Sequence, residues 1–141
     1  MQLDLKDHKI IEVLKENSRM AIRDIAKATG IRPSTVHDRI NRLIREKVIE
    51  KFTLKLNNKA IGENFIVFML VKSEVDIPNT YFGSDPHIKE VFGVTGEYDL
   101  MIKLKFKDIE EFNEFVINFR KKFSLKNTMT LVATINVKEE V

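Results

Sequence analysis

Polar and basic side chains that can contact nucleic acid gather in one short stretch of this sequence. They are Arg32, Ser34, Thr35, His37, Asp38, Asn41, Arg42 and Arg45. Guanidinium groups bind phosphate, hydroxyl groups bond phosphate oxygens or base edges, and an asparagine amide can form two hydrogen bonds with adenine. This combination of side chains predicts binding of double-stranded DNA.

The order of these residues along a helix divides them into two expected roles. Side chains near the start of a helix in the major groove lie deepest, so these are expected to meet base edges. The base-edge candidates are Ser34, Thr35, His37, Asp38 and Asn41. The phosphate candidates are Arg32, Arg42, Arg45 and Lys47. Arg39 has two open interpretations, an ion pair inside the domain (with Asp24 or Asp38, for example) or a phosphate contact.

Two predicted helices must hold these side chains in place. The first covers residues 21–28, Gly30 suits the left-handed position that ends a helix, and Pro33 suits the first turn of the next. The predicted buried face of the second helix is Val36, Ile40, Leu43 and Ile44. Two short helices around a glycine turn form a helix-turn-helix motif, here at residues 22–41. A three-helix bundle that binds protein is the alternative.

The flanking segments complete a first domain, residues 1–57. Asp4 and Asp7 have the spacing of a capping box at the start of a helix that should end near Asn17. Alternating apolar residues predict a strand over residues 48–56, and residues 57–59 form the turn that leads to the second domain, residues 58–141.

The second domain mixes strands and helices. Residues 65–71 are apolar on both faces, as in a central strand covered on both sides, and the turn-rich residues 76–86 leave room for a short helix or loop. The predicted strands are residues 65–71, 87–95, 100–106 and 128–137, and an amphipathic helix follows Asp108. This order is that of a ferredoxin-like βαββαβ domain. The predicted fold class is therefore α+β.

Composition excludes several function classes. The sequence has no cysteine, which excludes disulfides, thiolate catalysis and cysteine-bound metals and is compatible with a reducing cytoplasmic location. Residues 1–57 hold 13 Lys/Arg and 8 Asp/Glu, whereas residues 58–141 hold 11 and 13. The longest apolar run is too short to span a membrane. A polyanion partner is therefore expected for the first domain only, and we expect no membrane partner, cofactor or metal.

A set of short motifs, each weak alone, resembles the Lrp/AsnC family of transcription regulators over nearly the whole chain. The matching pieces are Asp4-x-x-Asp7-x-x-Ile10, Asp24-Ile25-Ala26, Thr29-Gly30-Ile31, Val36-x-x-Arg39-Ile40-x-x-Leu43, Val48-Ile49-x-x-Phe52, Val94-Thr95-Gly96-x-Tyr98-Asp99 and Thr130 with Thr134. The resemblance implies a winged helix-turn-helix domain and a C-terminal RAM domain that pairs into dimers, tetramers or octamers. It also implies an effector, usually an amino acid, near Gly96, Glu97, Tyr98 and Asp99.

Two departures from the family pattern bear on these expectations. Lys47 stands where the family usually has glycine, and a left-handed lysine costs about 1 kcal/mol or more. Residues 73–89 are shorter and richer in turns than the usual first RAM helix, so the effector or the oligomer could differ.

Two further readings stay open beside the DNA-binding regulator. Siroheme decarboxylase subunits resemble this family, but the three histidines here are scattered and no catalytic motif is present, so we expect no enzyme activity. An amino-acid-sensing module without DNA binding is the other alternative.

Overall fold

The computed structural model describes residues 2–141, which divide into two compact units. One unit is residues 2–55 together with Val141, and the other is Leu56–Glu140. Among residues 2–141, no helix is long and apolar enough to cross a membrane.

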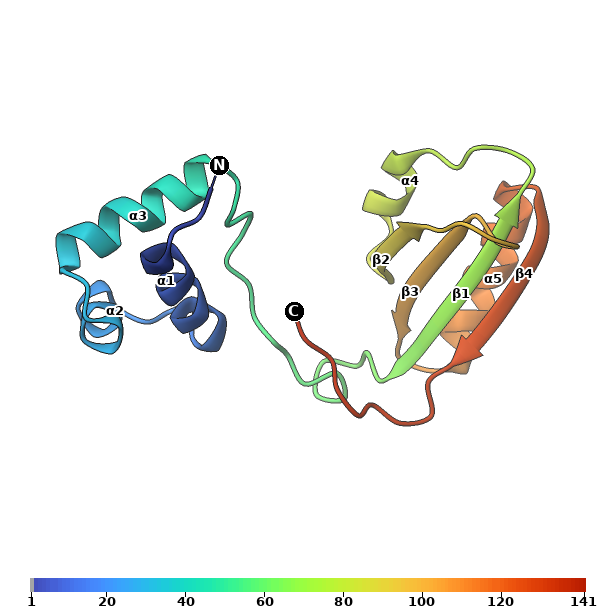
Figure 1. The fold of residues 1–141 in the computed structure, drawn as a ribbon. Helices are drawn as coiled ribbons and strands as arrows, with labels where there is room; N and C mark the ends of the chain where they lie inside the picture. Colours follow the sequence, from blue (N-terminus) through green and yellow to red (C-terminus); the bar gives the residue numbers. More distant parts are fainter. Residues whose placement is uncertain (1) are drawn as a thin grey trace. The chain divides into compact units, whose positions relative to one another are not determined.

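The N-terminal unit consists of three helices, α1 (Leu5–Glu16), α2 (Ile22–Thr29) and α3 (Pro33–Arg45) (Figure 1). The predicted capping box is confirmed: the Asp4 carboxylate accepts the Asp7 N–H, and the Asp7 carboxylate accepts the Asp4 N–H. Gly30 ends α2 in the left-handed conformation, at φ 70°. α1 ends at Glu16, beside the predicted end near Asn17, and α2 lies one residue later than the predicted range 21–28.

The core of this unit joins all three helices through a small set of apolar side chains. They are Ile10, Leu14, Ile25, Ala26, Ile31 and Val36. On α3, Val36 and Leu43 are fully buried and Ile40 is half-buried, as predicted. The prediction for Ile44 was wrong, because its side chain is 42% exposed. At about 100° per residue, Ile44 lies about 80° away from Val36 and so leaves the packed stripe.

The predicted strand over residues 48–56 is also wrong. This segment forms no helix or strand, and Phe52 and Leu54 are exposed. A strand needs a neighbour for its backbone hydrogen bonds, and no strand lies in the described part of the N-terminal unit. The alternating pattern therefore predicted an extended chain, but it could not show whether a second strand lies beside it to accept and donate the backbone hydrogen bonds.

The C-terminal unit is a four-stranded antiparallel sheet with two helices (Figure 1). Its elements are β1 (Phe65–Ser73), α4 (Asn79–Ser84), β2 (Ile88–Gly93), β3 (Leu100–Phe106), α5 (Ile109–Lys122) and β4 (Leu125–Val132). The strand order β2-β3-β1-β4 confirms the predicted ferredoxin-like α+β topology.

The predicted last strand, residues 128–137, was misplaced at both ends. The observed strand begins at Leu125 and ends at Val132. Val132 pairs with Val67, and β1 begins at Phe65, so the ladder ends within two residues of this pair. Residues 135–137 therefore have no strand to join, and the start at Leu125 follows from pairing with Ser73 at the other end.

One face of the sheet carries the core. Alternate residues of β1 and β3 are fully or almost fully buried against Phe115 and Phe119 of α5. These strand residues are Val67, Met69, Val71, Ile102, Leu104 and Phe106. Asp108 starts α5 as predicted, since its carboxylate accepts the Glu111 N–H. The Glu111 carboxylate accepts the Lys107 N–H rather than that of Asp108.

Candidate nucleic-acid interface and effector pocket

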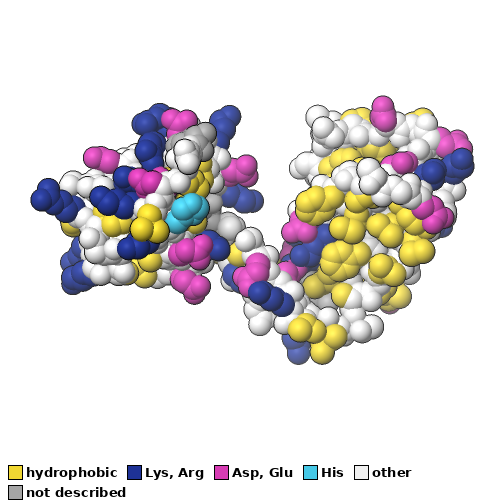
Figure 2. Space-filling view, viewed as in Figure 1, with side chains coloured by type: hydrophobic (Ala, Val, Ile, Leu, Met, Phe, Trp, Pro, Cys, Tyr) yellow, Lys and Arg dark blue, Asp and Glu magenta, His cyan; other side chains and the backbone are white. Residues whose placement is uncertain are grey.

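The exposed side of α3 brings together most of the residues predicted to contact DNA. The exposed members are Arg32, Ser34, His37, Asp38, Asn41 and Arg45, and Thr35 is half-buried. The described residues of the N-terminal unit also carry many other lysine and arginine side chains (Figure 2). The side of α3 opposite Val36 is therefore a polar surface whose donors and acceptors point to solvent.

Asn41 and His37 contact each other on this surface. The Asn41 amide nitrogen lies 3.3 Å from His37 Nε2 and 3.4 Å from Nδ1, and His37 Nδ1 lies 3.5 Å from an Asp38 carboxylate oxygen. The side chains of His37 and Asp38 are 62% and 82% exposed. Because these contacts are long and exposed, they can be exchanged for contacts with a base at little cost.

Two arginines of α3 point instead to the first turn of α1. Arg39 Nη1 donates to Asp4 Oδ1 at 2.6 Å and to Asp7 Oδ1 at 2.9 Å, and Arg42 Nη2 donates to Asp7 Oδ2 at 2.6 Å. The hydrogen bond from Arg39 holds the pKa of Asp4 well below its usual range. An ion pair inside the domain was one of the two interpretations of Arg39, but the partners suggested for it, Asp24 and Asp38, were wrong.

Sequence reasoning assigned Arg42 to phosphate and missed its bond to Asp7. Asp7 and Arg39 are named positions of the motifs that resemble the family, whereas Arg42 stands at an unspecified position. The buried face of α3 could be predicted, but the sequence does not show which part of α1 lies beside it. That packing decides which arginines reach Asp7.

The turn after α3 has lysine where the family pattern has glycine, yet its backbone is left-handed. Lys47 has φ 56° and is the non-glycine residue with positive φ in the described chain. The turn is closed by backbone bonds from Lys47 N–H to the Ile44 carbonyl and from Val48 N–H to the Leu43 carbonyl. The left-handed conformation is therefore kept despite the missing glycine.

The loop at Gly96–Asp99 is fixed at its base by the backbone. The Asp99 N–H donates to the Val71 carbonyl at 2.9 Å, the Val94 N–H donates to the Asp99 carbonyl at 2.9 Å, and Lys72 Nζ donates to the Glu97 carbonyl at 3.3 Å. Gly96 has φ 127°, a conformation that favours glycine. The loop thus holds Asp99 at a defined position beside the end of β1.

A hollow of about 510 Å³ lies next to this loop. Ile77, Phe82, Val91 and Leu100 are among its apolar walls. Its polar side chains are Ser73, Asp76, Asn79 and Asp99. Of the predicted effector residues, Asp99 lines the hollow, whereas Gly96, Glu97 and Tyr98 do not.

The rest of this pocket could be predicted only in part. Residues 76–86 were singled out as turn-rich, and α4 with its preceding loop supplies Asp76, Asn79 and Phe82. Their convergence with Asp99 depends on how α4 packs beside β2. The pattern of apolar residues along the sequence does not predict this packing, because it joins two separate elements.

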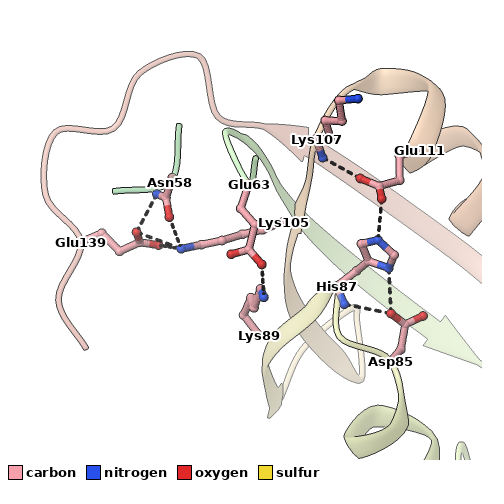
Figure 3. Close-up of polar contacts among 9 residues, drawn as sticks. All are labelled: Asn58, Glu63, Asp85, His87, Lys89, Lys105, Lys107, Glu111 and Glu139. Atoms are coloured by element: carbon pink, nitrogen blue, oxygen red, sulfur yellow. Dashed lines mark hydrogen bonds and ion pairs between the residues drawn. The ribbon is translucent and has the colours of Figure 1, made fainter. Parts of the chain in front are cut away.

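A second polar cluster surrounds His87 (Figure 3). His87 Nδ1 lies 2.9 Å from Asp85 Oδ1 and its Nε2 lies 3.0 Å from Glu111 Oε1, while the ring stacks on Phe106 at 4.8 Å between centroids. Burial opposes the charge on His87, but the bonds to Glu111 and Asp85 outweigh burial and raise its pKa. This histidine joins the start of β2 to the first turn of α5.

The other face of the sheet, called the open face below, carries exposed apolar side chains (Figure 2). Phe92, Met129 and Leu131 are 52%, 45% and 51% exposed. They alternate in register with the residues that pack on α5, so they point to the opposite face. Lys103 and Lys105 on the same face pair with Glu139 at 2.6 Å and 3.0 Å, as Figure 3 shows for Lys105.

Comparison with known proteins agrees with this two-part architecture. Residues 3–50 match the model of a winged helix-turn-helix DNA-binding domain, and residues 80–141 match that of the Lrp/AsnC ligand binding domain. The HTH-type transcriptional regulator FL11 of Pyrococcus furiosus is 41% identical over 120 residues, 81% of this chain and 78% of that protein. An uncharacterized HTH-type transcriptional regulator of Pyrococcus horikoshii is 36% identical over 99% of this chain and 97% of its own.

Solved structures share the fold at lower sequence identity. The L-Met complex of a transcriptional regulator from Neisseria meningitidis has a TM-score of 0.90 and 20% identity, covering 99% of this chain and 94% of that one. LrpC of B. subtilis has a TM-score of 0.87 and 24% identity, covering 99% of this chain and 100% of its own. Because both domains match and these relatives share them, the chain belongs to the Lrp/AsnC family of HTH-type transcriptional regulators.

Proposed function

We propose that this regulator reads a specific double-stranded DNA sequence with the exposed side of α3. The observation that carries the proposal is the solvent-facing row of hydroxyl, amide and guanidinium groups on the second helix of the motif. The base-reading residues are Ser34, Thr35, His37, Asp38 and Asn41, and Arg32 and Arg45 bind phosphate. Each good contact to a base edge is worth about 1–3 kcal/mol of discrimination.

Selection of bound duplexes from a random DNA pool, with purified full-length protein at two salt concentrations, tests this proposal. A recovered motif is the expected result. Asn41→Ala should then change the preference at one or two positions of the motif, while Asn113→Ala, an exposed asparagine on α5, should leave the profile unchanged. A pool that stays random at both salt concentrations would contradict the proposal and favour a sensing module without DNA binding.

The regulator acts as a dimer formed through the open face of the sheet. Support comes from Phe92, Met129 and Leu131, since a monomer would leave these apolar side chains in water. A two-fold dimer matches palindromic DNA, with half-sites about one helical turn apart or a multiple of it. The recovered motif therefore tests the symmetry as well as the specificity.

An amino acid that binds the hollow beside Gly96–Asp99 modulates the regulator. The Asp99 and Asp76 carboxylates suit an ammonium group, and Ile77, Phe82 and Val91 suit an apolar side chain. The Neisseria relative in complex with L-Met supports this class of ligand. A thermal-shift screen of amino acids should find a stabilising ligand for the natural protein and for Glu114→Gln, and none for Asp99→Asn.

If no amino acid stabilises the natural protein, the effector proposal fails while the DNA-binding proposal stands. If Asp99→Asn keeps the full shift, the ligand binds elsewhere. The two proposals therefore have independent tests.

A further inference from the structure

Asp7 is unusual because its carboxylate is buried in a small domain. Among the described residues, Asp7 is the buried charged residue, with an exposed fraction of 0%. The side chain of its capping partner Asp4 is 53% exposed. Burying a carboxylate is costly unless charged partners and hydrogen bonds compensate it. Capping of α1 alone requires no such burial, since cap residues usually lie at the surface.

The partners of Asp7 come from the recognition helix. Its Oδ1 accepts from Arg39 at 2.9 Å, its Oδ2 accepts from Arg42 at 2.6 Å, and Oδ2 also accepts the Asp4 N–H at 3.0 Å. Both carboxylate oxygens are thus bound to guanidinium groups that lie three residues apart on α3. Bonds to two successive turns of one helix fix its rotation and its axial position, which apolar packing fixes less sharply because it is not directional.

The same bonds draw both arginines away from the DNA-reading side. At about 100° per residue, Ser34, Asp38, Asn41 and Arg45 fall within a stripe about 60° wide, and Arg39 lies about 100° beyond it. Arg42 lies about 40° beyond the same edge, no farther from the stripe than Thr35 or His37, so its bond to Asp7 rather than its place on the helix turns it away. The side chains of Arg39 and Arg42 are 20% and 36% exposed, and Arg42 Nε is enclosed without a partner. A guanidinium held in this way is poorly placed to bind phosphate.

We propose that Asp7 is a positioning residue for DNA recognition, which sets the orientation of α3 through Arg39 and Arg42 and keeps both out of the phosphate contacts. The inference rests on the proposed reading of DNA by α3. Arg42 and Arg45 then have different roles: Arg42 binds Asp7, and Arg45 contacts phosphate. Loss of this clamp, the set of bonds from Asp7 to Arg39 and Arg42, should therefore reduce discrimination between sequences without loss of a phosphate contact.

The test measures Kd for the selected duplex and for a scrambled duplex of equal length at several salt concentrations. Full-length natural protein is compared with Asp7→Asn, Arg42→Gln and Arg45→Gln, and circular dichroism reports the folding of each variant. Each phosphate contact contributes about 0.9 to the slope of log K against log salt. The two readouts are the slope and the ratio of the two Kd values.

We expect Asp7→Asn and Arg42→Gln to lower the preference for the selected duplex about tenfold. The slope should be unchanged in Arg42→Gln and should not fall in Asp7→Asn, where the released Arg42 can gain a phosphate contact. Arg45→Gln should reduce the slope by about one and weaken both duplexes alike. A slope that falls by about one in Arg42→Gln, or an unchanged preference in folded Asp7→Asn, would overturn the proposal. If Asp7→Asn does not fold, Arg42→Gln decides by the same two readouts.

These outcomes are distinct from failure of the proposed function. If the natural protein itself binds the two duplexes equally, then α3 does not read sequence and the proposed function is wrong. If the natural protein prefers the selected duplex and only the effect of the clamp is absent, the proposed function stands without this inference.

Discussion

The two units of the chain differ in the kind of surface that their helices and strands leave exposed. The three helices of the N-terminal unit enclose their core, and α3 presents a polar side to solvent. The sheet of the C-terminal unit is covered on one face by α5 and leaves Phe92, Met129 and Leu131 exposed on the other. The proposed function assigns the polar exposed surface to DNA and the apolar exposed surface to a second copy of the chain.

The comparison also separates two kinds of polar contact. The side chains on the DNA-reading side of α3 make long, exposed contacts, while Asp7 and His87 make short contacts at partly or fully buried positions. The exposed contacts can be exchanged for a ligand, and the buried ones hold elements together. Four changes to the chain test this division, from the largest expected effect to the smallest.

Removal of a core side chain should affect one unit alone. Phe119→Ala should lower the free energy of unfolding of the C-terminal unit by about 3–5 kcal/mol, because the ring is buried and packs on Tyr81, Phe115 and Phe123. Hydrogen exchange resolved by residue is the measurement, with Ile117→Ala, exposed on the same helix, as the control. Equal loss of protection in α1 and α3 would show that the units do not unfold separately.

A charge on the open face should prevent association. Leu131→Glu should weaken the dimer at least about 30-fold, since an unpaired carboxylate would be buried between two sheets. Sedimentation over a range of concentrations measures this effect. Ile117→Glu places the same charge on the opposite side of the unit and should dimerise normally. Equal weakening in the two variants would exclude the open face as the specific interface.

The His87 cluster should make stability depend on pH. Its pKa is raised in the folded state, so its contribution is complete below the unfolded value of about 6.5 and is lost as pH rises through the folded value. His87→Gln should reduce the fall in unfolding free energy between about pH 6 and pH 8.5, because the variant has no imidazole to lose its proton. Urea unfolding at the two pH values measures it. A fall of the same size in His87→Gln would assign the pH dependence to other groups.

The smallest change concerns the turn after α3. Lys47→Gly should raise the unfolding free energy by less than about 1 kcal/mol, because relief of the left-handed conformation is partly offset by the greater freedom of unfolded glycine. Thermal unfolding compares it with Lys51→Gly, in the extended segment, which should stabilise nothing. A lower melting temperature for Lys47→Gly would show that the lysine side chain itself contributes to the turn.

Local signals in the sequence predicted the elements well where those signals suffice. The capping box at Asp4 and Asp7, the glycine that ends α2 and the helix start at Asp108 all depend on residues within one turn of each other. The strand expected at residues 48–56 and the end of β4 depend on a partner strand, which the pattern of one segment cannot supply.

The candidate sites divide along the same line. The polar side of α3 could be predicted because one helix carries all of its residues. The clamp between Asp7 and Arg42, the approach of Asp76 to the hollow lined by Asp99, and the contact of His87 with Glu111 join distant segments. Their formation depends on how the elements pack, so the residue types alone gave no more than candidates.

The central claim is that the exposed side of α3 reads a DNA sequence. Its most direct test is the ratio of Kd values for a selected and a scrambled duplex, measured for natural protein, for Ser34→Ala/Asn41→Ala and for Asn113→Ala as a control. Specific binding should be at least about 1,000-fold tighter for natural protein and for the control, and the double variant should lose most of that ratio. A ratio near one for natural protein, or an undiminished ratio in the double variant, would contradict the claim.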